Sequence, residues 1–473
     1  MNKRIYWFCL IFFGNVNIFA KQSPTPQQCT PVAQHAITDY MLIDNGSHFD
    51  SNFEFVPKHV RFTLVTTEEG QKGLTATQKL AFDKIIILPY LSFKHVLKAI
   101  KTSTHSYQST KLMVLNENLA LMVAKISAIL GIPGPTVQAM LPFCDKLISK
   151  RRLNNSSVHY PRFMVFDYHA YCLNPSDYIS SVISELGLPI VVKPNNLSGA
   201  NGVKKINSAN ELFEWCNNHS QGRKIIEDPM MKKQANASIF EFEEYIASDH
   251  ADLFHCDSII QNGKICFTQV SMYTYPLLAV VEGKPIGSIT LHTKDHRYKL
   301  LRACSEQVIQ AFRRYAPIPD GIMHLEAFYD NKAEKVIFLE TQLRYPGLET
   351  PLAYKIHLNI DIEEIHWKLQ MGLPVDCKQI KKGPFAMWVS IPTQNGTIDA
   401  IELPNALKSK IHRVQYRIEK GYKTSLPEAL TLCDHCKKIA LRLLISSPNY
   451  DHILSDFNYL KYFQPFKMEN KIA

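Results

Sequence analysis

Several patterns that would fix a simple architecture are missing from this chain of 473 residues. It contains no internal repeat and no low-complexity segment. Its basic residues form short, separated clusters such as Lys150-Arg151-Arg152, with no stripe interleaved with aromatics. The net charge of +10 therefore does not favour nucleic acid as a partner, and it suits small anionic substrates equally well. The composition, 46% hydrophobic and 20% charged, is that of a globular protein, and the length allows roughly three domains.

The eleven cysteines lack the spacing of a disulfide framework. Most lie within apolar runs, which predicts buried, reduced thiols of the kind found in the cytoplasm. Examples are Cys144, Cys256, Cys266 and Cys304. Cys433 and Cys436 form a C-x-x-C pair, but no second pair of ligands follows. Because a structural zinc ion needs four ligands, a zinc site is not favoured.

The first twenty residues point instead to export. Lys3 and Arg4 precede an apolar run over residues 5–14, and the residues before Lys21 resemble a signal-peptide cleavage site. The run is too short for a comfortable membrane span, so we expect no stable membrane association. We interpret residues 1–20 as a signal peptide or an N-terminal hydrophobic segment, and a misassigned start codon is a further alternative.

Three larger regions follow a linker, rich in Pro, Gln and Thr, at residues 21–37. Alternating strands and helices predict a small α/β domain with a mainly parallel sheet over 38–140. Its strands are expected at 40–43, 60–66, 84–89 and 111–115, and its helices at 91–101 and 117–130. A helical stretch at 142–153 begins a second domain, with hairpins and long helices, over 141–375. The third, a β-rich and helical subdomain, covers 376–473. Its strands are expected at 385–391, 396–401 and 410–419, and its helices at 427–445 and after 450.

Glu326 and Glu340 occupy matching positions on two predicted strands, 322–329 and 336–343. A hairpin symmetric about Ala333 pairs the two residues, and strand alternation then places both carboxylates on one face. Two like charges opposite each other destabilise a hairpin unless a cation lies between them. A hard divalent cation such as Mg²⁺ is suited to that place, whereas a solvated hairpin face is the alternative.

Gln342 and Arg344 continue this face at a period of two. Gln342 adds an oxygen ligand, and Arg344 adds a clamp for an anion. The four residues together predict a site for a metal ion and a negatively charged group.

Lys193 ends a predicted buried strand over 188–194, and Pro194 holds it extended. The loop at 195–202 is rich in small residues, whose backbone N–H groups can approach phosphate oxygens closely. A strand at 203–206 follows the loop, so the unit differs from a Walker loop and from a Rossmann fingerprint. Alone, a lysine at a strand end is commonly solvent-exposed decoration.

The alternating stretch at 238–246 predicts a strand that ends in Glu243 and Glu244. A strand that ends beside a nucleotide can offer backbone groups to an adenine edge. A nearby carboxylate, Asp252 or its rival Asp249, can accept the ribose hydroxyls. Two glutamates at a strand end are also common on a solvated surface.

In chain order, the motifs resemble those of the ATP-grasp superfamily of carboxylate–amine or carboxylate–thiol ligases. That order is Asp145-Lys146, Lys193-Pro194, the loop Ser198–Gly202, the strand end Glu243–Ile246, Glu326 and Glu340. The resemblance covers about residues 38–375. It implies an α/β (α+β) protein, in which an ATP-grasp fold is preceded by a small parallel-sheet α/β domain. A small β-rich C-terminal unit is expected to follow.

The resemblance also implies roles for individual residues. The residues that match its ATP-binding positions are Lys146 (in the pair Asp145-Lys146), Lys193, Ser198, Gly199, Ala200, Gly202, Glu243, Glu244, Ile246 and Asp252. Glu326, Glu340 and Gln342 match its ligands for Mg²⁺, with Mn²⁺ as an alternative ion. Arg344 matches a catalytic basic residue beside the reacting acyl phosphate. The frequent Glu-x-Asn metal motif is Glu340-Thr341-Gln342 here, and the closing glycine pair is Gly347-Leu348.

The implied activity is that of an ATP-dependent ligase. It activates a small carboxylic acid as an acyl phosphate and joins it to an amine, with release of ADP and phosphate. A ligase that uses a thiol or another nucleophile, and a non-catalytic ATP-binding protein, are the alternatives. Use of ATP favours a location in the cytoplasm, and the protein can be a monomer or a homo-oligomer. Candidates for the substrate pocket are Ser271, Tyr273 and Tyr275, with His296 and Arg297 on a lid.

Overall fold

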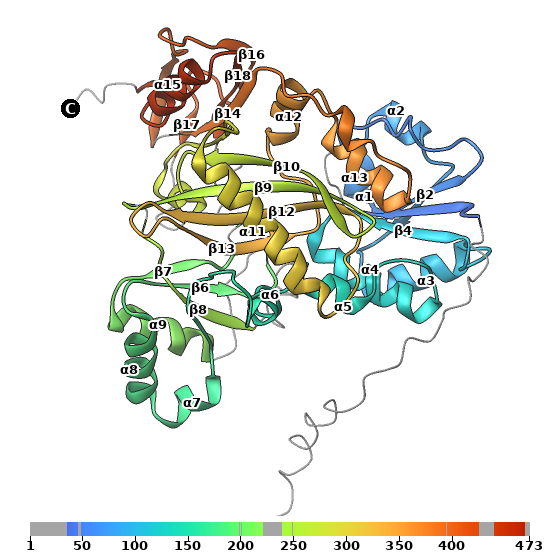
Figure 1. Cartoon of the computed structure of the whole chain (residues 1–473), viewed down its shortest axis with the longest axis horizontal. Coiled ribbons are helices and arrows are strands. Elements are labelled where there is room, and N and C mark those ends of the chain that lie inside the picture. Colours follow the sequence, from blue (N-terminus) through green and yellow to red (C-terminus); the bar gives the residue numbers. More distant parts are fainter. Residues whose placement is uncertain are drawn as a thin grey trace, which may run out of the picture. The chain divides into compact units, whose positions relative to one another are not determined.

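The structure is a computed structural model, and its strands form four sheets within the described residues (Figure 1). It describes residues 36–45, 49–197, 199, 201–220, 239–247, 249–393, 395–424 and 439–468. In this part of the chain no helix combines the length and the hydropathy needed to cross a membrane.

The first sheet is parallel throughout, with the strand order β3-β2-β1-β4. Its strands are β1 (Asp39–Ile43), β2 (Arg61–Thr67), β3 (Lys84–Leu88) and β4 (Thr110–Val114). The helices around it are α1 (Glu68–Lys72), α2 (Ala76–Leu80), α3 (Phe93–Ser103) and α4 (Glu117–Leu130). Helices α3 and α4 bury one apolar cluster against this sheet, and α4 ends at Gly131, whose φ of 68° suits glycine. The predicted α/β fold with a parallel sheet is confirmed.

A second, four-stranded sheet has the order β5-β8-β6-β7 and is antiparallel. Its strands are β5 (Phe163–Val165), β6 (Ile190–Pro194), β7 (Lys204–Ile206) and β8 (Phe240–Glu244). The helices α7 (Tyr168–Leu173), α8 (Pro175–Leu186) and α9 (Ala209–Ser220) accompany it. The segment before it contains α5 (Val137–Met140), η1 (Leu141–Phe143) and α6 (Lys146–Leu153). The predicted strand–loop–strand unit is formed by β6 and β7, which pair with each other across the segment that joins them.

The largest sheet has eight antiparallel strands in the order β13-β12-β9-β10-β11-β14-β18-β16. Its first five strands are β9 (Ala251–Gln261), β10 (Lys264–Tyr273), β11 (Ile286–Thr290), β12 (Gly321–Asp330) and β13 (Lys335–Gln342). The tail adds β14 (Phe385–Pro392), β16 (Lys410–Tyr416) and β18 (Ile439–Ser447) to the same sheet. The β-rich tail therefore extends the central sheet.

Helices cover the two faces of this sheet differently. Helix α11 (His296–Arg313) packs across β9, β10, β12 and β13 and covers an apolar face (Figure 1). Helices α12 (Thr350–Leu358) and α13 (Ile362–Met371) pack on the other face. Trp367 and Met371 of α13 also close the open face of the parallel sheet, so α13 joins the two sheets. The short η2 (Leu277–Glu282) and η3 (Cys377–Gln379) lie in connections.

The tail contains one wrong prediction. The helix expected at 427–445 is not formed at residues 439–445, which belong to β18. Residues 425–438, including Cys433 and Cys436, lie outside the described part of the chain. Strand β18 is paired on both sides and buried, so its apolar run is continuous and resembles a buried helix in sequence. The remaining elements of the tail are β15 (Gly396–Ile401), β17 (Lys423–Thr424), β19 (Phe466–Met468) and α15 (Tyr450–Leu460).

The expectation of reduced cysteines is wrong for Cys266. Cys144, Cys256 and Cys304 are free thiols, but Cys266 of β10 forms a disulfide with Cys377 of η3. The bond joins residues 111 positions apart, which no local spacing could have indicated. It ties the central sheet to the segment that follows α13.

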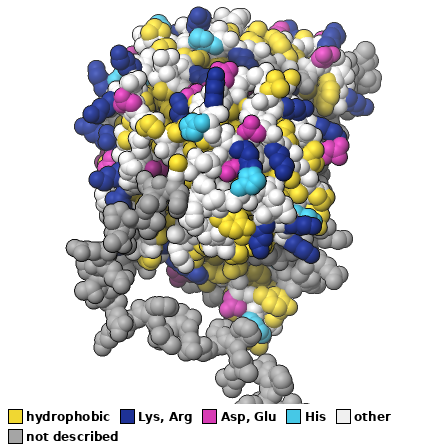
Figure 2. Space-filling view, turned by 90° about the vertical axis from the view of Figure 1, so that its right-hand side faces the viewer, with side chains coloured by type: hydrophobic (Ala, Val, Ile, Leu, Met, Phe, Trp, Pro, Cys, Tyr) yellow, Lys and Arg dark blue, Asp and Glu magenta, His cyan; other side chains and the backbone are white. Residues whose placement is uncertain are grey.

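The surface charge is dispersed on the face shown in Figure 2. Lys and Arg side chains lie among Asp and Glu side chains and apolar patches across the described residues of this face. The far face is not visible in that view.

Candidate active site

The two glutamates that the hairpin argument paired are opposite each other in the structure. Glu326 of β12 pairs with Glu340 of β13, as predicted. The turn itself is shorter by one position, since Asp330 pairs with Lys335. A β-bulge between Glu326 and Ala327 restores the predicted register at the glutamates.

Cations surround Glu340. Lys146 Nζ lies 3.4 Å from Glu340 Oε2 and donates to the carbonyl oxygen of Leu197 at 2.6 Å. Burial alone would raise the pKa of Glu340, but Lys146 and Lys193, with a hydrogen bond from Gln342 at 2.8 Å, lower it to about 2. A small cleft is lined by Glu117, Lys146, Glu340 and Gln342, among others. The structure thus brings together the predicted lysine, metal carboxylate and glutamine.

Lys146 is aimed by the start of helix α6. Asp145 caps this helix by accepting from the backbone N–H of Ile148 at 3.0 Å. Asn195, at the end of β6, donates to the second carboxylate oxygen of Asp145 at 2.6 Å and accepts from the N–H of Lys146 at 2.8 Å. The Asp-Lys pair therefore combines a structural cap with a reaching cation.

The loop after β6 is partly described. Gly199 and Gly202 have φ angles of 63° and 71°, which favour glycine. A Cβ atom at Gly202 would lie 3.3 Å from the ring of Pro194, so the close approach also requires glycine. Ser198 and Ala200 lie outside the described residues.

The strand predicted to read adenine carries a buried charge network that sequence reasoning missed. Lys150 of α6 is fully buried, donates to Glu241 at 2.8 Å and also contacts Glu243. Lys193 Nζ lies 2.7 Å from the other oxygen of Glu243, whose pKa is lowered because these two lysines outweigh its burial. Lys150 had looked like part of a surface basic cluster, and only the facing strand β8 explains its burial.

The neighbouring hinge residues are engaged differently. Glu244 pairs with Arg162 at 2.7 Å, and Ile246 packs partly buried against an apolar cluster. The side chains of Glu243 and Glu244 therefore form ion pairs. If this strand contacts adenine, the backbone groups near Ile246 are the candidates. Their predicted role in ATP binding stays a prediction.

Asp252 lies on a different side of the sheet from the two metal-site glutamates. It pairs with Tyr329, an odd number of positions from Glu326, so its side chain projects to the α11 face. There it lies 3.2 Å from Arg297 of α11. This placement argues against a ribose role for Asp252, and its rival Asp249 contacts His250 at 2.6 Å.

Arg344 is held by the N-terminal domain. Its Nε donates to Glu117 of α4 at 3.0 Å, and its Nη1 donates to the carbonyl oxygen of Tyr345 at 3.0 Å. Burial lowers the pKa of Arg344, but Glu117, and then Glu326 and Tyr273, raise it, so the guanidinium is charged. Glu117 was not identified from sequence, because it looked like an ordinary first-turn acid of a helix.

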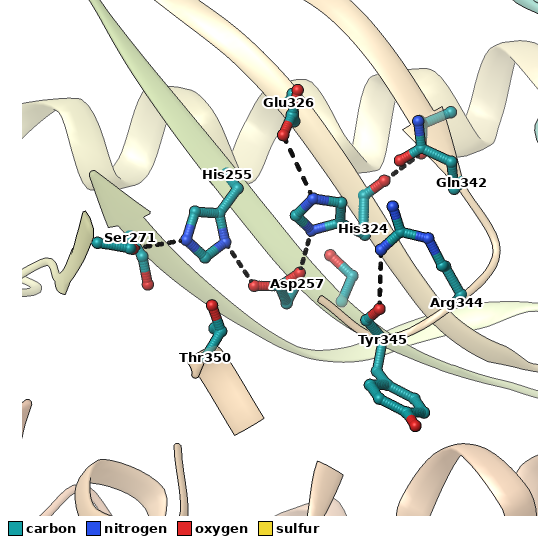
Figure 3. Close-up of polar contacts among 12 residues, drawn as sticks. His255, Asp257, Ser271, His324, Glu326, Gln342, Arg344, Tyr345 and Thr350 are labelled. Atoms are coloured by element: carbon teal, nitrogen blue, oxygen red, sulfur yellow. Dashed lines mark hydrogen bonds and ion pairs between the residues drawn. The ribbon is translucent and has the colours of Figure 1, made fainter. Parts of the chain in front are cut away.

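A chain of polar side chains crosses the same face of the sheet (Figure 3). Asp257 accepts from Nδ1 of His255 and from Nδ1 of His324, both at 2.7 Å, and from the hydroxyl of Tyr354 at 2.5 Å. Nε2 of His324 lies 3.5 Å from Glu326 Oε1. Burial would lower the pKa of His324, but Asp257 and Glu326 raise it to about 9. Sequence reasoning missed His324, although its position two residues before Glu326 on a strand places both side chains on the same face.

The substrate-pocket candidates are divided between the two faces. Tyr273 donates to Glu326 Oε1 at 3.0 Å, and Ser271 lies 3.2 Å from the hydroxyl of Tyr354. Tyr275 donates instead to the carbonyl oxygen of Lys461. The lid expected at His296 and Arg297 is wrong, because both residues belong to α11, which packs on the opposite face.

The donor set fits a hard divalent cation. Glu326 and Glu340 supply two paired carboxylates, Glu340 is ionised, and Gln342 Oε1 is buried with no hydrogen-bond partner. Oxygen ligands of this kind are those that Mg²⁺ and Mn²⁺ take.

Comparisons of sequence agree with this geometry. Residues 153–277 match the family model described as the D-ala D-ala ligase C-terminus. The chain is 29% identical over 272 residues to the L-arginine-specific L-amino acid ligase of Bacillus subtilis, covering 57% of this chain and 59% of that protein. It is 33% identical over 79 residues to the D-alanine–D-alanine ligase of Clostridium novyi, covering 17% of this chain and 23% of that protein. The sequence matches thus span less than two thirds of these relatives.

Solved structures share the fold. An L-amino acid ligase from Bacillus licheniformis superposes with a TM-score of 0.66 at 16% identity, covering 93% of this chain and all of that one. A carboxyaminoimidazole ribonucleotide synthase from Aspergillus clavatus, complexed with ATP, gives a TM-score of 0.59 at 11% identity and covers 90% and 97%. Together with the ordered lysines, glycine loop and paired glutamates, these matches support the ATP-grasp superfamily for this chain.

Proposed function

We propose that this protein is an ATP-dependent ligase that activates a small carboxylic acid as an acyl phosphate and joins it to an amine. The observation that carries the proposal is the Glu326–Glu340 pair, with Lys146 beside it and Arg344 on the neighbouring turn. The relatives that join amino acids support amino acids as both substrates.

The reaction needs two displacements. A carboxylate oxygen attacks the γ-phosphorus of ATP, and the bond from that phosphorus to the β–γ bridging oxygen breaks, releasing ADP. The amine nitrogen then attacks the acyl carbon, the acyl carbon–oxygen bond breaks, and phosphate leaves with the carboxylate oxygen as the amine loses a proton. Such transfer depends mainly on positioning and on neutralisation of charge.

The chain supplies the cations for both steps. Lys146 and Lys193 would neutralise phosphate oxygens. Burial lowers the pKa of Lys193, but the charges of Glu243, Glu241 and Glu340 outweigh this and raise it, so the ammonium is charged. Arg344 is charged and fixed by Glu117, so it can stabilise the oxyanion formed when the amine attacks. Loss of one such donor typically costs about 2.7–4 kcal/mol. The loop with Gly199 and Gly202 is proposed to close over the phosphates and exclude water.

Glu326, Glu340 and Gln342 would hold Mg²⁺, or Mn²⁺ in its place. A bound ion of this kind supplies charge neutralisation of the β- and γ-phosphate oxygens. The partners are then ATP, a small carboxylic acid and an amine, without nucleic acid. We place the protein in the cytoplasm, where ATP is available, and leave a homo-oligomer open.

The test is release of ADP with mixtures of amino acids, followed by mass spectrometry of the products. We expect ADP release that requires both a carboxylic acid and an amine, with a product heavier than either. Hydroxylamine in place of the amine should trap the acyl phosphate as a hydroxamate, and this identifies the acid across a library.

Other outcomes point to the alternatives. Turnover that requires a thiol in place of the amine would establish the other ligase type. ATP binding without ADP release for any acid would contradict catalysis and leave a nucleotide-binding protein.

A further inference from the structure

The carboxylate of Glu326 is contacted by side chains of neighbouring residues in the same sheet. Both contacts that the structure shows for Glu326 fall on the same oxygen, Oε1. Tyr273 donates to it at 3.0 Å, and Nε2 of His324 lies 3.5 Å away. Within the described part of the chain, no group hydrogen bonds to Oε2 of Glu326.

His324 is in turn fixed by Asp257. Nδ1 of His324 lies 2.7 Å from Oδ1 of Asp257, while the other oxygen of Asp257 receives His255 at 2.7 Å and Tyr354 at 2.5 Å. Asp257 accepts only, since burial is outweighed by the two histidines, which lower its pKa. Each ring nitrogen of His324 therefore faces a carboxylate oxygen. The ring links a fixed, buried carboxylate to a carboxylate that faces the site (Figure 3).

We propose that Asp257, acting through His324, and Tyr273 together position Glu326 by occupying its Oε1, so that its Oε2 is presented to the divalent cation. This inference rests on the metal assignment in the proposed function. It makes Asp257, His324 and Tyr273 positioning residues, since none of them needs to touch ATP or the amino acids.

His255, Asp257 and His324 could also be considered as a metal site of their own, since their ligand atoms lie within 4.8 Å of one another. The hydrogen bonds argue against this reading. Nδ1 of His255 and Nδ1 of His324 each lie 2.7 Å from a different oxygen of Asp257. These are hydrogen-bond distances, so a proton already occupies the space between each nitrogen and its oxygen. Nε2 of His255 also has a partner, Ser288 Oγ, at 2.7 Å. These contacts instead form a hydrogen-bonded cluster around Asp257, which reaches Glu326 through the 3.5 Å ion-pair contact of His324.

The physical reason for such a chain is orientation. An unrestrained glutamate can rotate its carboxylate, and fixing that rotation then reduces the free energy gained when the cation binds. Residues that hydrogen bond to metal ligands typically change metal affinity or activity 10–100-fold when replaced. The grip on Oε1 removes this freedom before the ion arrives.

The experiment is a titration with Mn²⁺, in which the electron paramagnetic resonance signal of the free ion reports binding. It is done on the full chain with a non-hydrolysable ATP analogue, so turnover is not needed. We expect His324→Asn and Asp257→Asn each to raise the dissociation constant of Mn²⁺ by roughly 10–100-fold. The double variant should be no worse than the weaker-binding single variant, because both changes interrupt one connection.

Further variants make the test specific. Tyr273→Phe removes only a hydroxyl from a large, well-packed side chain, so it tests the grip on Oε1 even if the other variants fail to fold. His324→Gln keeps an N–H donor near the position of Nε2 and should retain more affinity than His324→Asn. His357→Asn is the matched control, because His357 is buried on α12 and bonds to the carbonyl oxygen of Pro384. It should change the affinity by less than about twofold.

Glu326→Gln separates the two possible failures. Unchanged Mn²⁺ affinity in Glu326→Gln contradicts the metal assignment itself. Weak binding in Glu326→Gln, together with wild-type affinity in folded His324→Asn, Asp257→Asn or Tyr273→Phe, overturns the positioning inference. Mn²⁺ bound to the protein without nucleotide, and lost in His255→Asn, would instead show a separate ion at the histidines and also overturn it.

Discussion

Leu325 and Glu326 are neighbours on β12, yet they belong to surfaces of opposite character. Leu325 projects into the apolar cluster under α11, with Cys256 as its partner on β9. Glu326 projects to the other face, where its partner on β9 is His255 and its partner on β13 is Glu340. A second polar row, formed by Gln342, His324 and Asp257, lies beside the first. Alternate residues of β12 therefore pack in the apolar core, and the residues between them project to the proposed site.

The difference teaches how buried charge is tolerated. On the polar face, carboxylates are matched: Glu340 has Lys146 and Lys193, and its pKa is lowered to about 2. Glu363 of α13, which helps close the same side of the sheet, makes no ion pair with a lysine or arginine of the described residues. It accepts from the N–H of Asp50 and from Trp367, and burial raises its pKa to about 7. The paired carboxylate Glu340 thus stays ionised, whereas burial opposes the ionisation of Glu363 and weakens the fold as pH rises.

The largest expected effect comes from the polar face. Glu340→Gln keeps the shape of the side chain but removes the charge that faces Lys146 and, in the proposed site, the divalent cation. We expect ATP-dependent turnover to fall by roughly a thousandfold or more, because several kcal/mol of charge stabilisation are lost. Steady-state ADP release measures this, and circular dichroism checks that the fold is retained. Turnover at the wild-type level would contradict the metal assignment.

A change on the apolar face should do the reverse. Leu301 of α11 is fully buried in the cluster that the helix forms with the sheet. Leu301→Ala should destabilise the protein by about 2–5 kcal/mol through lost burial and a residual cavity. We expect kcat to change little while the protein is folded, since no polar-face residue loses a contact. Urea unfolding and ADP release measure the two quantities, and a lost kcat with unchanged stability would break the comparison.

The smallest effect concerns Glu363 and depends on pH. Its folded-state pKa is raised from 4.5 to about 7, so the stability it contributes is present below about 4.5 and is lost as pH rises through about 7. The loss is at most about 3 kcal/mol for a shift of this size. Glu363→Gln should flatten the dependence of the urea midpoint on pH in this window. An equally steep dependence in the variant would show that Glu363 is not the group responsible.

Local pattern was enough for much of the fold and for the central pair. Alternation and turn residues predicted the parallel sheet and the Glu326–Glu340 pairing, even though the structure reaches that register through a bulge. The helix predicted over residues 117–130 was likewise confirmed. These features depend on residues close together in the chain.

The misses depend on contacts between distant segments. Glu117 became a partner of Arg344 only through the packing of α4, 227 positions away in sequence. Lys150 is buried because β8 brings Glu241 and Glu243 to it. The ribose role of Asp252 stays a prediction; its side chain lies on the α11 face, and a shift of one residue on a strand reverses the face. The disulfide of Cys266 with Cys377 and the strand β18 also depend on neighbours that the local sequence does not reveal.

The central claim is that the acid is activated by phosphoryl transfer to its carboxylate. Once a substrate acid is found, its carboxylate can be labelled with ¹⁸O on both oxygens and turned over with ATP and the amine. The account predicts that each phosphate released carries one ¹⁸O atom, because the carboxylate oxygen leaves with the phosphorus. Phosphate free of ¹⁸O, or label found in AMP, would contradict it.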